Sequence, residues 1–256
     1  MGSFSSMASH CIVLIPIYRP LLEPLEEFSV DLSVRKLFSR EMLFLAPEGL
    51  DTAYYQKRYP FIAIQTFPAG FFASIHGYNQ LLLNPAFYQM YAQYEFMLIL
   101  QTDAIVLRDE LSEWMARPYD YIGAPWPVAN ELVVQIPPFD GDRGKHLRIH
   151  VGNGGLSLRR NQSCIELLNE YSAACDMFIR TGSSEDLFFS FMGSVSKRFI
   201  LPNEVVASEF SLEISPEQYI AMNAGRLPMG AHAWWKHAHA FWMAQFSSGD
   251  SLIQAV

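Results

Sequence analysis

The sequence predicts an α/β protein in which helices flank a mostly parallel central sheet. Short apolar runs alternate with amphipathic segments between residues 11 and 100, and this alternation is typical of strands joined by helices. Half of the 256 residues are hydrophobic and 17% are charged, so the chain can bury a large core. These observations predict one large domain over residues 11–246 rather than a disordered chain.

The first half of the chain contains four predicted strands, and helices are predicted between them. The strands cover residues 11–17, 42–46, 61–67 and 95–100, and the helices cover residues 28–38 and 75–91, with Pro85 inside the second. Proline and glycine follow several of the strands and mark their ends. Ligands of open α/β sheets bind beyond the carboxyl ends of the strands, so the residues after the fourth strand are the first candidates for a site.

The second half of the chain has a less regular pattern. Residues 118–138 are rich in Pro, Trp and Tyr, and residues 139–150 are polar and charged, so we expect a long loop or flap near the site. A short strand and two helices are predicted after it, at residues 156–158, 161–180 and 185–192. The aromatic-rich residues 234–242 are expected to pack against the main body.

Composition excludes several classes of function. A net charge of −8 argues against nucleic acid as a partner, because phosphate binding needs a basic face. The three cysteines are scattered and form no C-x-x-C pair, which fits free thiols in a cytoplasmic protein. No apolar run approaches the ~20 residues of a transmembrane helix. Residues 1–10 are interpreted as a leader and residues 247–256 as a tail.

Four polar or glycine-rich stretches could form a site. Asp103 follows the fourth strand in Gln101-Thr102-Asp103, where it would bind a ligand or only end a turn. The glycines of residues 152–155 let the backbone approach a ligand, or form a tight turn. Glu185 and Asp186 precede an apolar helix, where acids also favour the helix dipole. His232 lies among Ala and Trp, where a histidine is commonly a packed core residue.

Taken in order, these stretches carry a resemblance. The segments YEFMLILQTDAIVLRDEL, YDYIGAPW, VGNGGLSLRR, SEDLFFS and GAHAWWK resemble an uncharacterised group of bacterial proteins with a GT-A-type, Rossmann-like glycosyltransferase fold. Their order is also similar to that of inverting nucleotide-sugar transferases. The resemblance divides the domain into a nucleotide-binding half, residues 11–108, and an acceptor and metal half, residues 109–246.

The resemblance implies a donor and metal site. Asp103 matches the last carboxylate of an Asp-x-Asp motif, and His232 matches a late metal ligand, together suiting Mn²⁺ or Mg²⁺. Gln101 stands where the first Asp of the motif would be, which weakens the expected dependence on metal; His237 and His239 are weaker candidates than His232. The donor-binding residues implied are Pro16, Tyr18, Arg19, Gln101, Thr102 and Asp103.

The same resemblance implies an acceptor side. Asp186 is the expected general base, which takes the proton of the acceptor hydroxyl, and Glu185 is the second candidate, as an acceptor-binding residue. Helix capping by Ser183 or Ser184 is the structural alternative for this pair. Trp126, Asn153, Gly154 and Gly155 are expected to contact sugar.

We therefore expect a glycosyltransferase that moves a sugar from a nucleotide-sugar donor to a saccharide or glycolipid hydroxyl, with metal assistance and inversion. The expected setting is polysaccharide or lipopolysaccharide biosynthesis in the cytoplasm, at the inner face of the membrane if peripheral contact occurs. Two alternatives stay open. One is a non-catalytic sugar- or nucleotide-binding protein with a degenerate Asp-x-Asp motif, and the other is a nucleotidyltransferase.

Overall fold

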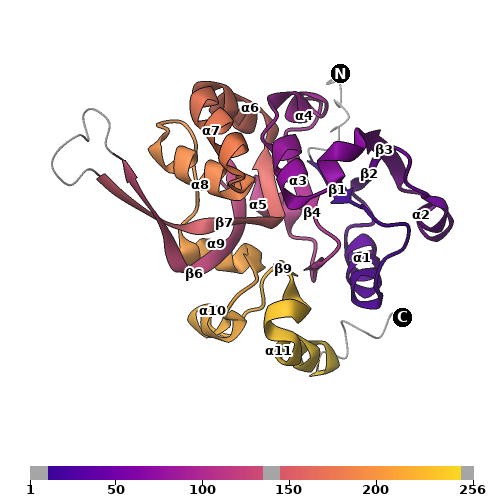
Figure 1. The fold of residues 1–256 in the computed structure, drawn as a ribbon. Coiled ribbons are helices and arrows are strands. Elements are labelled where there is room, and N and C mark those ends of the chain that lie inside the picture. Colours follow the sequence, from indigo (N-terminus) through magenta and orange to yellow (C-terminus); the bar gives the residue numbers. More distant parts are fainter. Residues whose placement is uncertain (1–10, 135–144, 249–256) are drawn as a thin grey trace, which may run out of the picture.

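The computed structural model describes residues 11–134 and 145–248, and within them the strands form two sheets. The main sheet contains β1 (Cys11–Pro16), β2 (Glu41–Pro47), β3 (Ala63–Phe67), β4 (Phe96–Leu100), β6 (Tyr121–Val134) and β7 (Lys145–Arg160). The small sheet contains β5 (Ala104–Val106), β8 (Ser211–Leu212) and β9 (Gly230–His232). The main sheet has the order β3-β2-β1-β4-β7-β6, and the small one β5-β9-β8 (Figure 1).

The predicted parallel sheet is confirmed in its first four strands. β3, β2, β1 and β4 pair in parallel, while β7 runs antiparallel to both β4 and β6. Every residue of β1 is buried, because helices cover both faces of the sheet, and such strands read as continuous apolar runs. The side chains of β1 alternate between two cores: Ile12 and Leu14 belong to one, and Val13 and Ile15 to the other.

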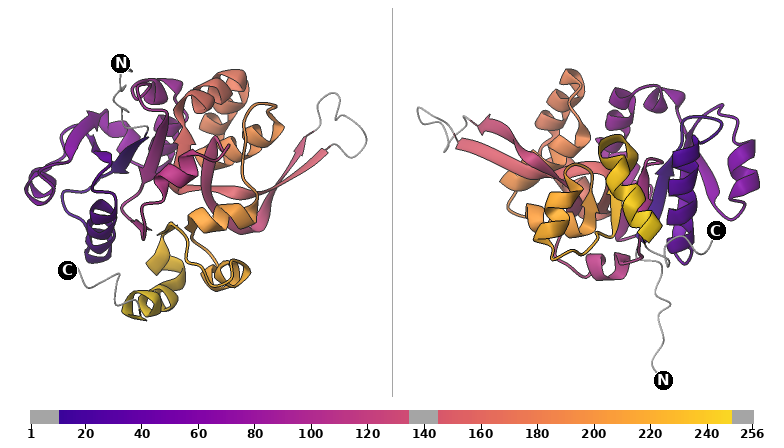
Figure 2. Two further views of the ribbon diagram at one scale, coloured as in Figure 1. Left: turned by 180° about the vertical axis from the view of Figure 1, so that it is seen from behind. Right: turned by 90° about the horizontal axis from the view of Figure 1, so that it is seen from below.

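The helices divide between these cores (Figure 2). One face is covered by α3 (Ile75–Leu82), α4 (Pro85–Gln89), α6 (Asn161–Glu170), α7 (Ser172–Thr181) and α8 (Glu185–Val195). The other face is covered by α1 (Pro24–Lys36), α2 (Ala53–Arg58), α5 (Leu111–Met115) and α9 (Glu204–Phe210). A 3₁₀ helix, η1 (Ala69–Phe72), precedes α3.

Two helices predicted as continuous are each broken in the structure. The expected helix at residues 75–91 is α3 followed by α4, because the Asn84 side chain accepts a hydrogen bond from the Ala86 N–H and caps a new helix with Pro85 in its first turn. The expected helix at residues 161–180 is α6 followed by α7. Its break falls at Tyr171, whose backbone leaves the helical region.

The predicted flap is largely a pair of strands. β6 and β7 form a long antiparallel pair whose outer part projects from the body (Figures 1 and 2). Register shifts near Ala124 and Pro125 interrupt the pairing, and such bulges accommodate proline in a strand. The prolines therefore bend a strand here instead of ending it. Residues 135–144 of the expected flap lie outside the described residues.

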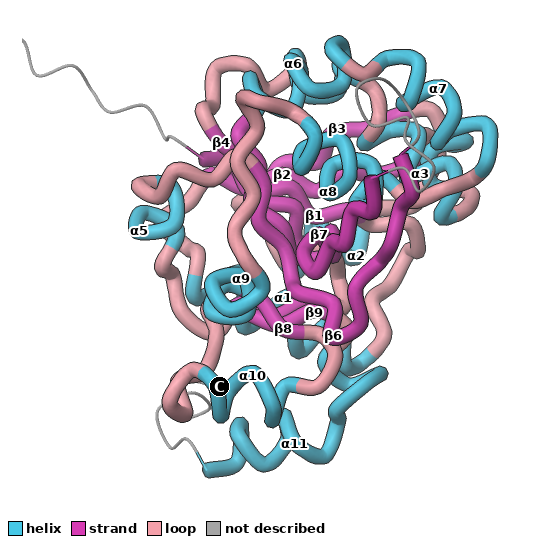
Figure 3. Tube along the Cα trace, turned by 90° about the vertical axis from the view of Figure 1, so that its left-hand side faces the viewer, coloured by secondary structure: helices cyan, strands magenta, loops and turns pink. Residues whose placement is uncertain are grey.

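The C-terminal segment packs along one side of the molecule, at the bottom of Figure 1. It comprises α9, β8, α10 (Pro216–Met222), β9 and α11 (Trp234–Ser248), and Figure 3 shows the small sheet between the main sheet and the last two helices. Trp234 and Trp242 are fully buried, which confirms the expected packing of the aromatic run, and the Trp234 indole donates to Ser29 of α1 at 2.9 Å.

Two further expectations concern the ends and the chemistry of the chain. The expected leader, residues 1–10, and residues 249–256 of the expected tail lie outside the described residues; residues 247 and 248 belong to α11. Cys11, Cys164 and Cys175 are buried, and none of them forms a disulfide. In the part of the chain that is described, no helix is both long and apolar enough to cross a membrane.

Candidate active site

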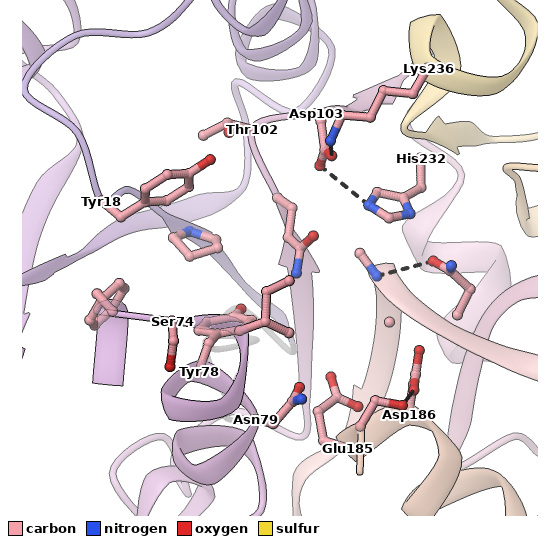
Figure 4. A pocket seen from close by; sticks show the side chains of 18 of the residues that line it. Tyr18, Ser74, Tyr78, Asn79, Thr102, Asp103, Glu185, Asp186, His232 and Lys236 are labelled. Carbon is pink, nitrogen blue, oxygen red and sulfur yellow. Dashed lines mark hydrogen bonds and ion pairs between the residues drawn. The ribbon is translucent and has the colours of Figure 1, made fainter. Parts of the chain in front are cut away.

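A cavity of about 530 Å³ opens at the carboxyl ends of β1 and β4 (Figure 4). This is where parallel α/β sheets bind ligands, since β1 and β4 are neighbours in the sheet. The cavity gathers most of the residues predicted from sequence: Pro16, Tyr18, Gln101, Thr102, Asp103, Asn153, Gly154, Gly155, Glu185, Asp186 and His232. Five segments far apart in the sequence therefore meet at one place.

Sheet pairing brings Asp103 and His232 together. β5 and β9 pair antiparallel with Ala104 opposite His232, and the Ala233 N–H donates to the Asp103 carbonyl at 2.9 Å. His232 Nε2 consequently lies 3.3 Å from Asp103 Oδ1. Gly155 completes the contact: a Cβ on it would lie 2.1 Å from His232 Nε2, so the imidazole rests directly on the glycine backbone.

Acidic and basic groups alternate around this contact. Lys236, in the first turns of α11, places Nζ 2.6 Å from Asp103 Oδ2, and its side chain is 53% exposed. Glu213 lies on the opposite side of the imidazole, with Oε1 3.5 Å from His232 Nδ1. Its other oxygen accepts a hydrogen bond from the Asn153 amide. The result is a chain of charges that runs from Lys236 through Asp103 and His232 to Glu213.

These neighbours shift two pKa values. Burial alone would raise the pKa of Asp103, but His232 and Lys236 bring it well below its ordinary value. Burial alone would lower the pKa of His232, but Asp103 and Glu213 raise it to about 9. Without a ligand, the imidazole is therefore protonated at neutral pH between two carboxylates.

The other end of the cavity is built on a buried ion pair. Arg159 of β7 is fully buried and donates through Nη2 to Glu185 Oε1 at 2.8 Å, and the Glu185 side chain is 6% exposed. Arg159 also donates to the hydroxyls of Tyr88 and Ser157. Among the described residues, Glu185 Oε2 has no hydrogen-bond partner. Burial raises the pKa of Glu185 to about 7, although Arg159 opposes the shift.

Asp186 is held beside Glu185 at the start of α8. Its Oδ1 accepts hydrogen bonds from the Ser184 hydroxyl at 2.5 Å and the Leu187 N–H at 2.7 Å. Burial raises its pKa, and these hydrogen bonds oppose the shift. The predicted helix-terminal contacts thus exist, but in them Asp186 itself accepts the hydrogen bonds and Ser184 is the donor.

Gly154 allows β7 to pass close to the ion pair. A Cβ on Gly154 would lie 2.8 Å from Glu185 Oε1 and 3.1 Å from Arg159 Nη2. Asn153 is oriented by its contact with Glu213, and its Oδ1 accepts from the Gly155 N–H at 3.3 Å. The glycines predicted from sequence are therefore needed for close approach within a strand, and not for the expected tight turn.

Two predicted residues do not line the cavity. Arg19 donates to Glu23 and Glu26 at the start of α1, so its guanidinium is engaged by these two carboxylates. Trp126 packs over Gly152, where a Cβ would lie 2.7 Å from its ring. Thr102 does line the cavity, but its hydroxyl donates to Glu26 at 2.9 Å, so it ties the Asp103 loop to α1.

Several residues of the site were not predicted. Lys236, Ser74, Tyr78 and Asn79 line the cavity. Lys236 follows His232 by four residues in the segment GAHAWWK, so its closeness in the sequence was a usable signal. α3, which carries Tyr78 and Asn79, was predicted as a helix, but nothing in its sequence indicates that its first turns face the site.

The side chains that could ligate a metal ion can be compared with the needs of a divalent cation. Within residues 11–134 and 145–248, no group of three or more His, Cys, Asp or Glu side chains is placed to hold a metal ion. Asp103 and His232 nevertheless offer an oxygen and a nitrogen side by side, with Glu213 behind the imidazole as carboxylates commonly stand behind metal-binding histidines. Such a pair fits a cation that takes its remaining ligands from phosphate and water.

The fold is shared with known structures. The chain has a GT-A glycosyltransferase fold, as solved structures with little sequence identity show. A galactosyltransferase LgtC in complex with donor and acceptor sugar analogs is 13% identical, with a TM-score of 0.58 over 92% of this chain and 94% of that one. Mouse xyloside xylosyltransferase 1 in its apo form is 10% identical, with a TM-score of 0.50 over 86% of this chain and 96% of that one.

The chain belongs to the family described as "Protein of unknown function (DUF5672)", whose sequence model matches residues 61–232. The match begins before β3 and ends at His232, so it includes Asp103, the glycines of β7 and the Glu185-Asp186 pair. No curated protein sequence matches the chain.

Proposed function

We propose that this protein is a glycosyltransferase that moves a sugar from a nucleotide-sugar donor to a hydroxyl of a saccharide or glycolipid acceptor. One observation carries the proposal: a single cavity in a GT-A fold has Asp103, His232 and Lys236 at one end and the carboxylates of Glu185 and Asp186 at the other (Figure 4). Sugar transfer needs charge stabilisation at a departing diphosphate and a base at the acceptor.

The Lys236 end suits the diphosphate. The ammonium of Lys236 is half exposed and rests on Asp103, so it can turn to donate to phosphate oxygens. Asp103 and His232 would hold a divalent cation, Mn²⁺ or Mg²⁺, which would neutralise the charge that develops on the leaving diphosphate. Pro16 ends β1 and Tyr18 lies two residues beyond it, also in the lining of the cavity. Tyr18 is 53% exposed, which suits stacking on a nucleobase.

The Asp186 end suits proton transfer. Asp186 would take the proton of the acceptor hydroxyl while that oxygen bonds to the anomeric carbon and the bond from that carbon to the diphosphate breaks. Its Ser184 and Leu187 hydrogen bonds fix its orientation, and its raised pKa makes it a stronger base than an exposed carboxylate. A base on the face opposite the diphosphate gives inversion.

The biological setting rests on the sequence resemblance. We extend the proposal to polysaccharide or lipopolysaccharide assembly in a bacterial cytoplasm, with the acceptor at the membrane surface. The LgtC structure, which holds both donor and acceptor sugar analogs, supports a cavity of this fold that receives two sugars.

A second candidate is a sugar-nucleotide binding protein without turnover. Gln101 contributes no charge beside Asp103, and Lys236 already occupies one Asp103 oxygen. A site that uses the Lys236 ammonium in place of a divalent metal ion would bind the diphosphate without metal.

A thermal-shift screen separates these candidates, because a ligand that binds the native state raises its melting temperature. Nucleoside diphosphates and nucleotide-sugars would be tested with and without Mn²⁺ on the wild type, on Asp103→Ala, and on Asp176→Ala, an exposed carboxylate on α7 outside the cavity. A Mn²⁺-dependent shift that only Asp103→Ala loses supports the transferase. A metal-independent shift favours the binding protein, and no shift with any nucleotide contradicts both.

A further inference from the structure

The deep end of the cavity is lined by carboxylates and neutral polar groups. Glu185 and Asp186 lie there beside Asn79 of α3, at the opposite end from Lys236 (Figure 4). The Glu185 side chain is only 6% exposed, so a group that contacts it must be inserted into the bottom of the cavity.

Among the described residues at this end of the cavity, no cation is free to pair with a ligand carboxylate. Arg159 contacts Glu185, but its guanidinium is fully buried and donates to Glu185, Tyr88 and Ser157. Among the described residues that line the cavity, the basic side chains are Lys236 and His232, and both contact Asp103. Arg159 offsets only one of the two carboxylate charges of Glu185 and Asp186. An anionic group placed beside Glu185 would therefore meet a net negative charge with no free cation among the described lining residues.

A hydroxyl group would meet the reverse situation. Glu185 Oε2 is buried and has no hydrogen-bond partner within the described residues, and a buried carboxylate oxygen gains much from one donor. The Asn79 amide beside it can both donate and accept, and the Asn79 side chain makes no hydrogen bond that would occupy it in the described part of the chain. A polyhydroxylated ring supplies such donors at short spacing.

We propose that the transferred sugar is uncharged, a hexose or pentose rather than a uronic acid, and that Glu185 is the residue that rejects acidic sugars. The proposal rests on the proposed function, because it assigns the sugar of the same donor. It makes Glu185 a specificity-determining residue that binds the donor sugar, and not the acceptor-binding residue expected from sequence. Specificity of this kind comes from an unfavourable charge contact with the wrong ligand.

The test compares two nucleotide-sugars that differ only at C6. Affinities for UDP-glucose and UDP-glucuronic acid, and for GDP-mannose and GDP-mannuronic acid, would be measured by calorimetry at pH 8, above the pKa of about 7 of the Glu185 carboxyl. We expect the wild type to bind the neutral member about 100-fold more tightly, since like charges in contact cost several kcal/mol. Glu185→Gln should reduce that ratio at least about 10-fold, because the amide keeps the shape but removes the charge.

Controls separate the possible failures. Glu217→Gln, an exposed acid on α10, makes the same change in net charge and should leave the ratio unchanged. Equal binding of the two sugars by the wild type would overturn this inference but leave the transferase proposal standing. If Glu185→Gln and Glu217→Gln show the same ratio of affinities for the neutral and the acidic sugar, the proposed role of Glu185 is overturned. If Glu185→Gln does not fold, the wild-type ratio still tests whether the bound sugar is uncharged. A lower ratio in Asp186→Asn then tests whether negative charge at this end of the cavity rejects acidic sugars. Binding of neither pair, nor of UDP or GDP, would contradict the proposed function itself.

Discussion

Gly155→Ala is expected to displace His232 from the site and to destabilise the protein. A Cβ at this position would lie 2.1 Å from Nε2, 2.2 Å from Cδ2 and 2.5 Å from Cε1 of the imidazole. All three distances are far shorter than a van der Waals contact. The ring cannot move freely, because Asp103 and Glu213 face its two nitrogens.

The magnitude follows from the cost of inserting a methyl group into a packed site. Such overpacking destabilises by about 1–3 kcal/mol. For a chain of this size a change of 1 kcal/mol shifts the melting temperature by about 2–4 °C, so a loss of about 2–12 °C is expected. No left-handed backbone conformation occurs at Gly155, so the loss comes from the contact and not from backbone strain.

Thermal unfolding followed by circular dichroism measures this loss, with Gly70→Ala as the matched control. A Cβ on Gly70 meets nothing within 4 Å. His232→Ala removes the obstructing ring, so Gly155→Ala should cost much less in that background, a coupling that a double-mutant cycle reports. If Gly155→Ala is as stable as Gly70→Ala, or costs the same with and without the imidazole, the assigned packing is wrong.

Three further predictions concern the charges of the cavity. Arg159→Met should lower the free energy of unfolding in urea by about 3–5 kcal/mol, because it leaves the buried Glu185 unpaired; stability close to wild type would refute the pairing. Burial raises the pKa of Glu185 from 4.5 to about 7, so the folded state binds more protons than the unfolded state between these values. The free energy of unfolding contributed by this group therefore falls as pH rises through that window, and urea titrations of Glu185→Gln should lack this component. Lys236→Met should weaken nucleoside diphosphate binding about 10–100-fold, since a hydrogen bond to a charged group contributes about 1.5–3 kcal/mol; calorimetry that shows unchanged affinity would exclude the ammonium from the phosphate site.

The parallel half of the fold was predictable because its signal is local. β1 and β4 are buried along their whole length, so each appears as a continuous apolar run that ends in proline or is followed by a polar residue. The β6–β7 pair was missed because bulges around Pro125 interrupt the alternation on which strand prediction depends. Asn84 and Pro85 restart a helix inside an otherwise periodic segment, a local capping signal that the periodicity concealed.

The site was predictable only in part for a related reason. Asp103 and the Glu185-Asp186 pair stand at the ends of elements, where a carboxylate is noticeable in the sequence. The contacts that set their chemistry come from distant segments: Lys236 pairs with Asp103 across 133 residues, and Arg159 pairs with Glu185 across 26. Arg159 lies in an apparently ordinary strand, so its burial and its role beside Glu185 emerge only from the fold.

The most direct test of the central claim is the release of nucleoside diphosphate from the nucleotide-sugar that binds best. Release would be followed with Mn²⁺ and a panel of saccharide acceptors, for the wild type, Asp103→Asn and the surface control Asp176→Ala. The proposed function predicts saturable, acceptor-dependent release by the wild type and Asp176→Ala, and release at least about 100-fold slower in Asp103→Asn, because an interaction with the charge that develops on the leaving group is lost. Tight binding of the nucleotide-sugar, with wild type and Asp103→Asn both at the uncatalysed rate, would contradict the claim and identify a binding protein.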